Sequence, residues 1–338
     1  MAKPNKWERL AERLRDAIRA GLEVPPDLPA QVTEHAARLR QRAGPDVDPV
    51  EIAWRRTRER ARKTAAIGAV TTLPAMVPGV GSALAAFGLV ADWKYVAEQQ
   101  RDLVLEIAAL LGALPEDPTE DVLALFLAGA GAAFGGKMVG EAAIKLLAER
   151  AAKRAFSRVI PGAGAVVAGA VNYGATFAIG RAAISRFAAD AGVEVRGLIP
   201  TRIHPRMTEL RNAVLAAVGT ASPSWSFSAD QRVAIQELSR SEREELFDFA
   251  VMSAAAEDGV SVAEHRVLSR LADALGFTSA ELGEALDAVH REQTSYAGRI
   301  QSVLGTTREV GGGVARGAWK RARNLAQDGA RRFRREES

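Results

Sequence analysis

Cysteine is absent from this chain of 338 residues, and aromatic residues are sparse at 6%. Without cysteine, the chain has no disulfide, no thiolate metal ligand and no cysteine nucleophile. The four histidines are scattered, and no two have the spacing of a zinc site on a helix. No segment alternates apolar and polar residues, so we expect almost no strand. These absences predict an all-α protein packed through Ala, Val, Leu and Gly, with no catalytic residues and no cofactor.

Charge is missing from two long stretches, 64–91 and 159–180, although 25% of the chain is charged. Each stretch could cross a hydrocarbon core of about 30 Å as a single helix. However, each contains a Pro-Gly elbow, which disfavours an unbroken helix. We therefore expect two helical hairpins, either dipped into lipid or buried in protein. The elbow residues are Pro78, Gly79, Gly81, Pro161, Gly162 and Gly164.

Asn172 is the one side-chain amide in the second charge-free stretch. A buried amide needs hydrogen-bond partners. It either binds a lipid headgroup or ties two helices together, and we favour the second role.

Amphipathic basic helices are predicted near both ends of the chain. In 6–22 the apolar residues, Trp7 among them, fall on one arc at 100° per residue. In 314–335, Trp319 and Phe333 share an arc whose surroundings are basic. Such helices lie on anionic lipid, where each basic residue adds about 1 kcal/mol. The basic residues proposed for this surface are Lys320, Arg321, Arg323, Arg331 and Arg332.

Trp93 and Tyr95 follow the first charge-free stretch directly and suit an interfacial aromatic belt. Two alternatives remain for the C-terminal helix: a solvated tail, or a tail docked on an acidic part of the same chain. Nucleic acid is a weaker alternative, because the basic residues are accompanied by no nucleic-acid-binding motif.

An acidic segment precedes the basic C-terminus. Residues 223–292 hold six basic and fourteen acidic residues, a net charge of −8, whereas 293–338 have a net charge of +6. Within the acidic segment, four pairs have the spacing of a helix-capping box, so it is predicted to be a compact helical domain. The pairs are Ser228 and Gln231, Ser241 and Glu244, Ser261 and Glu264, and Thr278 and Glu281.

Residues 55–215 resemble the EcsC family of bacterial membrane-associated helical proteins. The resemblance rests on the first elbow, on the run from Gln100 to Gly112, and most of all on the run from Ile160 to Gly174. It implies an all-helical, membrane-associated core, and no catalytic residue is carried over from the family.

Residues 225–292 resemble the TerB-like domain of tellurite-resistance and stress proteins. The run from Ala254 to Leu268 carries the resemblance, with Asp258-Gly259 followed by Ser261 and Glu264. It implies an acidic module tied to envelope or chemical stress, sometimes credited with binding divalent cations. Glu257, Asp258 and Glu264 are the candidate ligands. The segment lacks the alternating oxygen ligands of an EF-hand loop, so we favour a turn and a helix cap over a metal site.

These observations predict four regions: an amphipathic segment 1–54, an EcsC-like core 55–215, a TerB-like domain 216–292 and a basic tail 293–338. We expect a non-enzymatic protein that docks on anionic lipid at the inner face of the cell membrane. Through its acidic module it would recruit a protein partner in a stress response, and a homo-oligomer is compatible with the sequence. The alternatives are a membrane-perturbing effector of a bacterial defence system and a soluble scaffold. The N-terminus lacks the apolar run of a secretory signal, which favours the cytoplasm.

Overall fold

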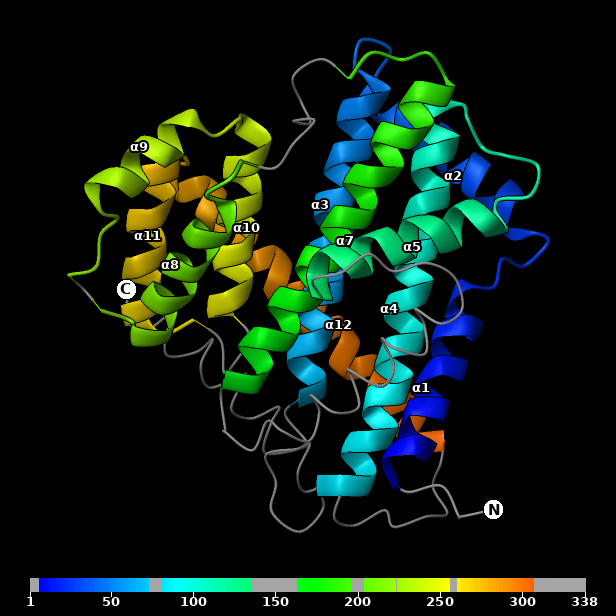
Figure 1. The fold of residues 1–338 in the computed structure, drawn as a ribbon, viewed down its shortest axis with the longest axis horizontal. Helices are drawn as coiled ribbons and strands as arrows, with labels where there is room; N and C mark the ends of the chain where they lie inside the picture. Colours follow the sequence, from blue (N-terminus) through cyan, green and yellow to red (C-terminus); the bar gives the residue numbers. More distant parts are fainter. Residues whose placement is uncertain are drawn as a thin grey trace. The chain divides into compact units, whose positions relative to one another are not determined.

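A computed structural model describes residues 6–72, 81–134, 163–195, 204–222, 224–255 and 260–306. Within these ranges the chain forms eleven helices and no strand, which confirms the all-α prediction (Figure 1). The helices are α1 (Lys6–Leu22), α2 (Leu28–Ala43), α3 (Pro49–Thr72), α4 (Gly81–Leu111), α5 (Thr119–Phe134), α7 (Ala163–Asp190), α8 (Met207–Thr220), α9 (Ala229–Glu237), α10 (Arg240–Ala254), α11 (Val262–Leu275) and α12 (Ser279–Thr306).

Two compact units divide the chain, and the division runs through three helices. Unit 1 comprises 1–64, 86–160 and 171–199, and unit 2 comprises 65–85, 161–170 and 200–338. Helices α1, α2 and α5 lie in unit 1, α8 to α12 lie in unit 2, and α3, α4 and α7 have parts in both. The domain boundary expected at 215–216 falls inside α8.

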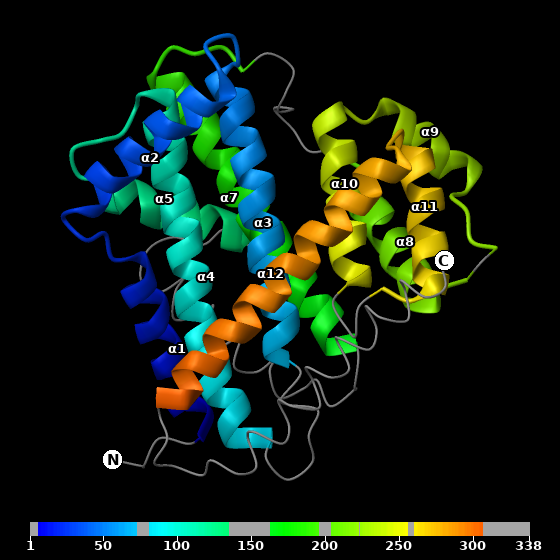
Figure 2. The ribbon, with the colours of Figure 1, turned by 180° about the vertical axis from the view of Figure 1, so that it is seen from behind.

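Helix α1 buries its predicted apolar arc in unit 1, beside α4 (Figures 1 and 2). Gly21 allows a close approach, because a Cβ atom there would lie 2.5 Å from the carbonyl oxygen of Lys94 and 2.7 Å from the Cβ of Ala97. Arg101 of α4 also donates to the carbonyl oxygen of Glu23, at 2.6 Å. The buried side chains of α1 are Leu10, Leu14, Ala17, Ile18 and Leu22.

An aromatic cluster joins α3 to α7 in the core of unit 1. The ring of Phe177 lies edge-on to Trp54, with centroids 4.9 Å apart, and stacks on Tyr173 at 5.5 Å. All three side chains are buried. Gly180 of α7 faces Thr57 of α3, and a Cβ atom at Gly180 would collide with the threonine side chain. Burial in this core therefore accounts for the charge-free character of 173–180.

Capping boxes begin four helices of unit 2, as predicted, but one of them stands at other residues. The boxes at Ser228, Ser261 and Thr278 are confirmed. Helix α10 uses Ser239 and Glu242 instead of Ser241 and Glu244, so that prediction was wrong by two residues.

Both pairs of α10 have the spacing of a capping box, and contacts along and beyond the helix decide between them. Glu242 accepts from its own box and also from the backbone N–H of His204, at 2.8 Å. Glu244 lies two residues further on and pairs with Arg240, one helical turn before it, at 3.2 Å.

The core of unit 2 forms where α8, α11 and α12 pack on α10 (Figure 2). The guanidinium of Arg211 on α8 pairs with Glu245 and lies 5.9 Å from the ring centroid of Phe249. Phe247 stacks on Phe277, with centroids 4.4 Å apart.

The length and hydropathy needed to cross a membrane are not combined in any helix of the described ranges.

Candidate functional site

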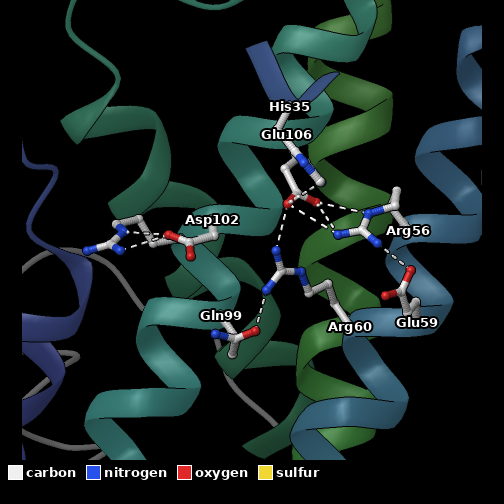
Figure 3. A network of polar contacts seen from close by, with 8 residues as sticks. His35, Arg56, Glu59, Arg60, Gln99, Asp102 and Glu106 are labelled. Carbon is white, nitrogen blue, oxygen red and sulfur yellow. Dashed lines mark hydrogen bonds and ion pairs between the residues drawn. The ribbon is translucent and has the colours of Figure 1, made fainter. Parts of the chain in front are cut away.

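A buried carboxylate held between two arginines is the main polar feature of unit 1 (Figure 3). Only 4% of the Glu106 side chain on α4 is exposed. Arg56 of α3 donates to Glu106 Oε2 through Nε and Nη2, both at 3.1 Å, and Arg60 Nη2 donates to Oε1 at 2.6 Å. Both carboxylate oxygens are therefore bound, and α3 is joined to α4 by charge-assisted hydrogen bonds.

Three further side chains surround this ion pair. His35 of α2 brings its Nε2 atom to 3.7 Å from Glu106 Oε1. Arg60 also donates to Gln99. The other guanidinium branch of Arg56 donates to Glu59, about one helical turn further along α3. Both bonds appear in Figure 3. We call Arg56, Arg60, Gln99 and Glu106 the charge clamp.

The arginines hold Glu106 in its ionised form. Burial alone raises the pKa of Glu106, but the charges of Arg60 and Arg56 outweigh it and leave the pKa below its usual range. For Arg56, burial lowers the pKa, whereas Glu106 and Glu59 raise it, and the net effect is a raised pKa. At neutral pH the clamp therefore stays charged and paired, which suits a structural link rather than a proton donor or acceptor.

A second polar group lies beside the clamp, where α3, α4 and α7 meet. The hydroxyls of Thr64 and Thr176 share a hydrogen bond of 2.8 Å, and Gln100 Nε2 donates to Thr176 at 2.8 Å. Asn172 Nδ2 donates to the carbonyl oxygen of Thr64 at 3.3 Å. We call these four residues the threonine junction. Thr64, Thr176 and Gln100 are buried, so each of these polar groups has exchanged water for a protein partner.

The order of these contacts fixes the direction of the helices. Along α3, Arg56 meets Glu106 and Arg60 meets Gln99, so α3 and α4 are antiparallel. Thr57 faces Gly180 and Thr64 meets Asn172, so α3 and α7 are antiparallel too. Along their own axes the three helices therefore become charge-free in the same direction: α3 after Lys63, α4 before Asp92 and α7 before Arg181.

The residues predicted at the elbows are only partly described. Gly81 is the first residue of α4, and Gly164 lies in the first turn of α7. Asn172 connects α7 to α3, which is the structural role favoured for it from the sequence. The other four elbow residues, Pro78, Gly79, Pro161 and Gly162, lie outside the described residues.

Among the residues predicted at a membrane surface, Trp93 and Tyr95 lie half-buried on α4. Trp7 belongs to α1, whose apolar arc faces the protein interior rather than a free surface. The exposed face of α1 carries both signs equally, with Glu8, Glu12 and Asp16 against Arg9, Arg13 and Arg19. The C-terminal candidates, from Trp319 to Phe333, lie outside the described residues.

The candidate metal ligands are not brought together in the part of the chain that the structure describes. Glu264 accepts from the backbone N–H of Ser261 at 2.8 Å and so serves as a helix cap. Glu257 and Asp258 lie outside the described residues. No group of three or more His, Asp or Glu side chains among those described has the geometry of a metal site.

The acidic character of unit 2 is partly internal. Four acidic residues of α10 are buried: Glu242, Glu244, Glu245 and Asp248. Apart from Glu209 of α8, which pairs with Arg206, the acidic surface described for unit 2 that remains for a partner comes from α9, α11 and α12. Its exposed residues are Asp230, Glu237, Asp273, Glu281, Glu284 and Asp287.

The charge clamp was not predicted from the sequence, although the sequence contains a signal for it. Glu106 is the one charged residue in the apolar run from Leu103 to Leu111. A lone acid in such a run requires a buried cation. The sequence offers fifteen basic residues in 1–63 alone, and nothing local to Glu106 indicates Arg56 and Arg60.

Searches against protein-family models, curated proteins and solved structures found no match to this chain.

Proposed function

We propose that this chain is a membrane-associated helical protein that docks on anionic lipid and recruits a protein partner through unit 2. One observation carries the proposal: α3, α4 and α7 are clamped together, and all three become charge-free in the same direction along their axes. Water favours charged and polar surface, whereas a bilayer surface favours charge-free helix ends followed by aromatic and basic residues.

Two further observations support docking on anionic lipid. Trp93, Lys94 and Tyr95 follow the charge-free start of α4, and 52% of the Lys94 side chain is exposed. The segment 293–338 has a net charge of +6, which adds electrostatic attraction to an anionic surface. We further propose, from the resemblances of the sequence to the EcsC family and to TerB-like domains, that this activity serves a bacterial envelope or chemical-stress response.

A soluble scaffold is the second candidate, and the burial of Tyr173 and Phe177 favours it. Where those residues lie, the absence of charge is explained by packing within the protein. If the rest of both charge-free stretches is also packed inside, lipid binding is not needed to explain them.

Flotation of the purified full chain, free of detergent, with neutral and with anionic vesicles separates these candidates. We expect flotation with anionic vesicles at low salt, and a fraction that persists at about 1 M salt, where the Debye length is only about 3 Å. Binding that salt removes completely would assign docking to the basic segments alone. No flotation under any condition would contradict the proposal and favour the scaffold.

Neutralising the tail provides the matched control. The full chain with Arg321, Arg323, Arg331 and Arg332 replaced by Gln should lose most of its low-salt binding, because four attractions of about 1 kcal/mol each are removed. Its salt-resistant fraction should stay unchanged.

A further inference from the structure

Helix α1 is an amphipathic helix whose apolar face has two suitable partners. In the structure that face is buried in unit 1, with Leu14 and Ile18 fully covered. The same face, with Trp7 on its arc, has the pattern of a helix that lies on a membrane. One face cannot serve both partners at once, so the docked position of α1 withholds it from lipid.

The net charge of α1 and the residues before it suits an anionic partner. The whole segment 1–22 holds six basic and three acidic residues, a net charge of +3. A free α1 therefore combines an apolar face with a net positive charge, which complements an anionic lipid surface.

Besides its buried apolar side chains, α1 has two close backbone contacts with α4 at its C-terminal end. Gly21 lies against the backbone of α4 at Lys94, and Arg101 donates to the carbonyl oxygen of Glu23. Beyond Glu23, the chain continues through Pro25 and Pro26 before α2 begins at Leu28. A change at Gly21 or Arg101 therefore weakens the docking of α1 without touching the charge clamp.

We propose that α1 is an autoinhibitory helix that leaves unit 1 and lays its apolar face on an anionic membrane surface. The inference rests on the proposed function, because it assumes that the chain meets lipid. It adds that the docked state is the weaker lipid binder, and that membrane binding competes with the contact between α1 and α4.

Gly21→Ala is the sharpest test. The added methyl group meets the carbonyl oxygen of Lys94, which cannot rotate away, so docking of α1 is weakened. A loss of about 1.4 kcal/mol in docking corresponds to about tenfold, so we expect the variant to bind anionic vesicles up to about tenfold more tightly than the wild type. Gly283→Ala on α12 is the control, because a Cβ atom there meets nothing within 4 Å and the residue lies outside both charge-free stretches, so its vesicle affinity should be unchanged.

Arg101→Ala provides a second release variant if Gly21→Ala does not fold, since it removes the hydrogen bond to Glu23. Hydrogen exchange of residues 6–22 measures the release directly and should rise in both variants. Increased exchange in α1 with unchanged or weaker vesicle binding would overturn the inference while leaving the proposed function standing. No vesicle binding by the wild type or either variant would overturn both.

Discussion

Units 1 and 2 both bury carboxylates in helical cores, but different kinds of contact hold them together. In unit 1 the decisive contacts join residues far apart in the sequence: Glu106 to Arg56, and Thr176 to Thr64. In unit 2 the helices begin with capping boxes formed by residues three apart, such as Ser239 with Glu242. Unit 1 therefore depends on a few long-range polar links and close helix contacts, whereas much of the order in unit 2 is specified locally.

Among the variants that test this contrast, removal of Glu106 should cause the largest loss of stability. Glu106→Ala leaves Arg56 and Arg60 largely buried without their shared partner, which costs about 3–5 kcal/mol of the free energy of unfolding. Urea unfolding followed by circular dichroism measures the loss. Glu59→Ala is the control, because 59% of that side chain is exposed and its pairing with Arg56 contributes less than about 1 kcal/mol. Similar losses in the two variants would contradict the importance of the clamp.

The close contact between α1 and α4 should give the next largest effect. Gly21→Ala places a methyl group 2.5 Å from the carbonyl oxygen of Lys94 and should cost about 1–3 kcal/mol. Gly174→Ala should instead stabilise the protein by up to about 1 kcal/mol, because alanine favours a helix interior and the site is open. Thermal unfolding of the two variants should therefore shift in opposite directions, and a shift in the same direction would count against a tight α1–α4 contact.

A smaller effect tests the local order of unit 2. Ser239→Ala removes the cap of α10 and should cost about 1 kcal/mol. Ser241→Ala should cost less than about 0.5 kcal/mol, since the bond from Ser241 reaches only the hydroxyl of Ser239. A larger loss of stability in Ser241→Ala than in Ser239→Ala, measured by urea unfolding, would instead favour the capping box predicted at Ser241.

The pH dependence of the clamp should give the smallest difference. The pKa of Glu106 is lowered on folding, so the unfolded chain binds a proton more readily than the folded chain does. The stabilisation is complete above the usual glutamate pKa of about 4.3, and it is lost as the pH falls through the lower pKa of the folded protein. The stability difference between wild type and Glu106→Gln, measured by urea unfolding from pH 7 to pH 3, should shrink only in the acidic part of that range. A constant difference would mean that Glu106 contributes by shape rather than by charge.

The same contrast explains what the sequence could predict. The apolar arc of α1 and three of the four capping boxes follow from spacings of three or four residues, which sequence patterns report well. The box of α10 failed because two overlapping pairs fit the same pattern, and a contact from His204, 38 residues away, stabilises the true one.

The partners of Glu106 in the candidate site could not be predicted from local sequence patterns, for a related reason. Glu106 signals that a cation is needed, but the choice of Arg56 and Arg60, about 50 residues earlier, depends on how α3 packs against α4. From the sequence we expected the apolar arc of α1 to lie on lipid, whereas in the structure its described side chains are packed against unit 1.

Hydrogen exchange of the full chain, with and without anionic vesicles, tests the central claim most directly. If the charge-free stretches meet lipid, amides within 64–91 and 159–171 should gain protection when vesicles are added. Amides of the clamp around Arg56 and Glu106, which lie away from the contact with α1, should not change. Protection confined to the basic segment 293–338, or no change in the charge-free stretches of vesicle-bound protein, would contradict the account.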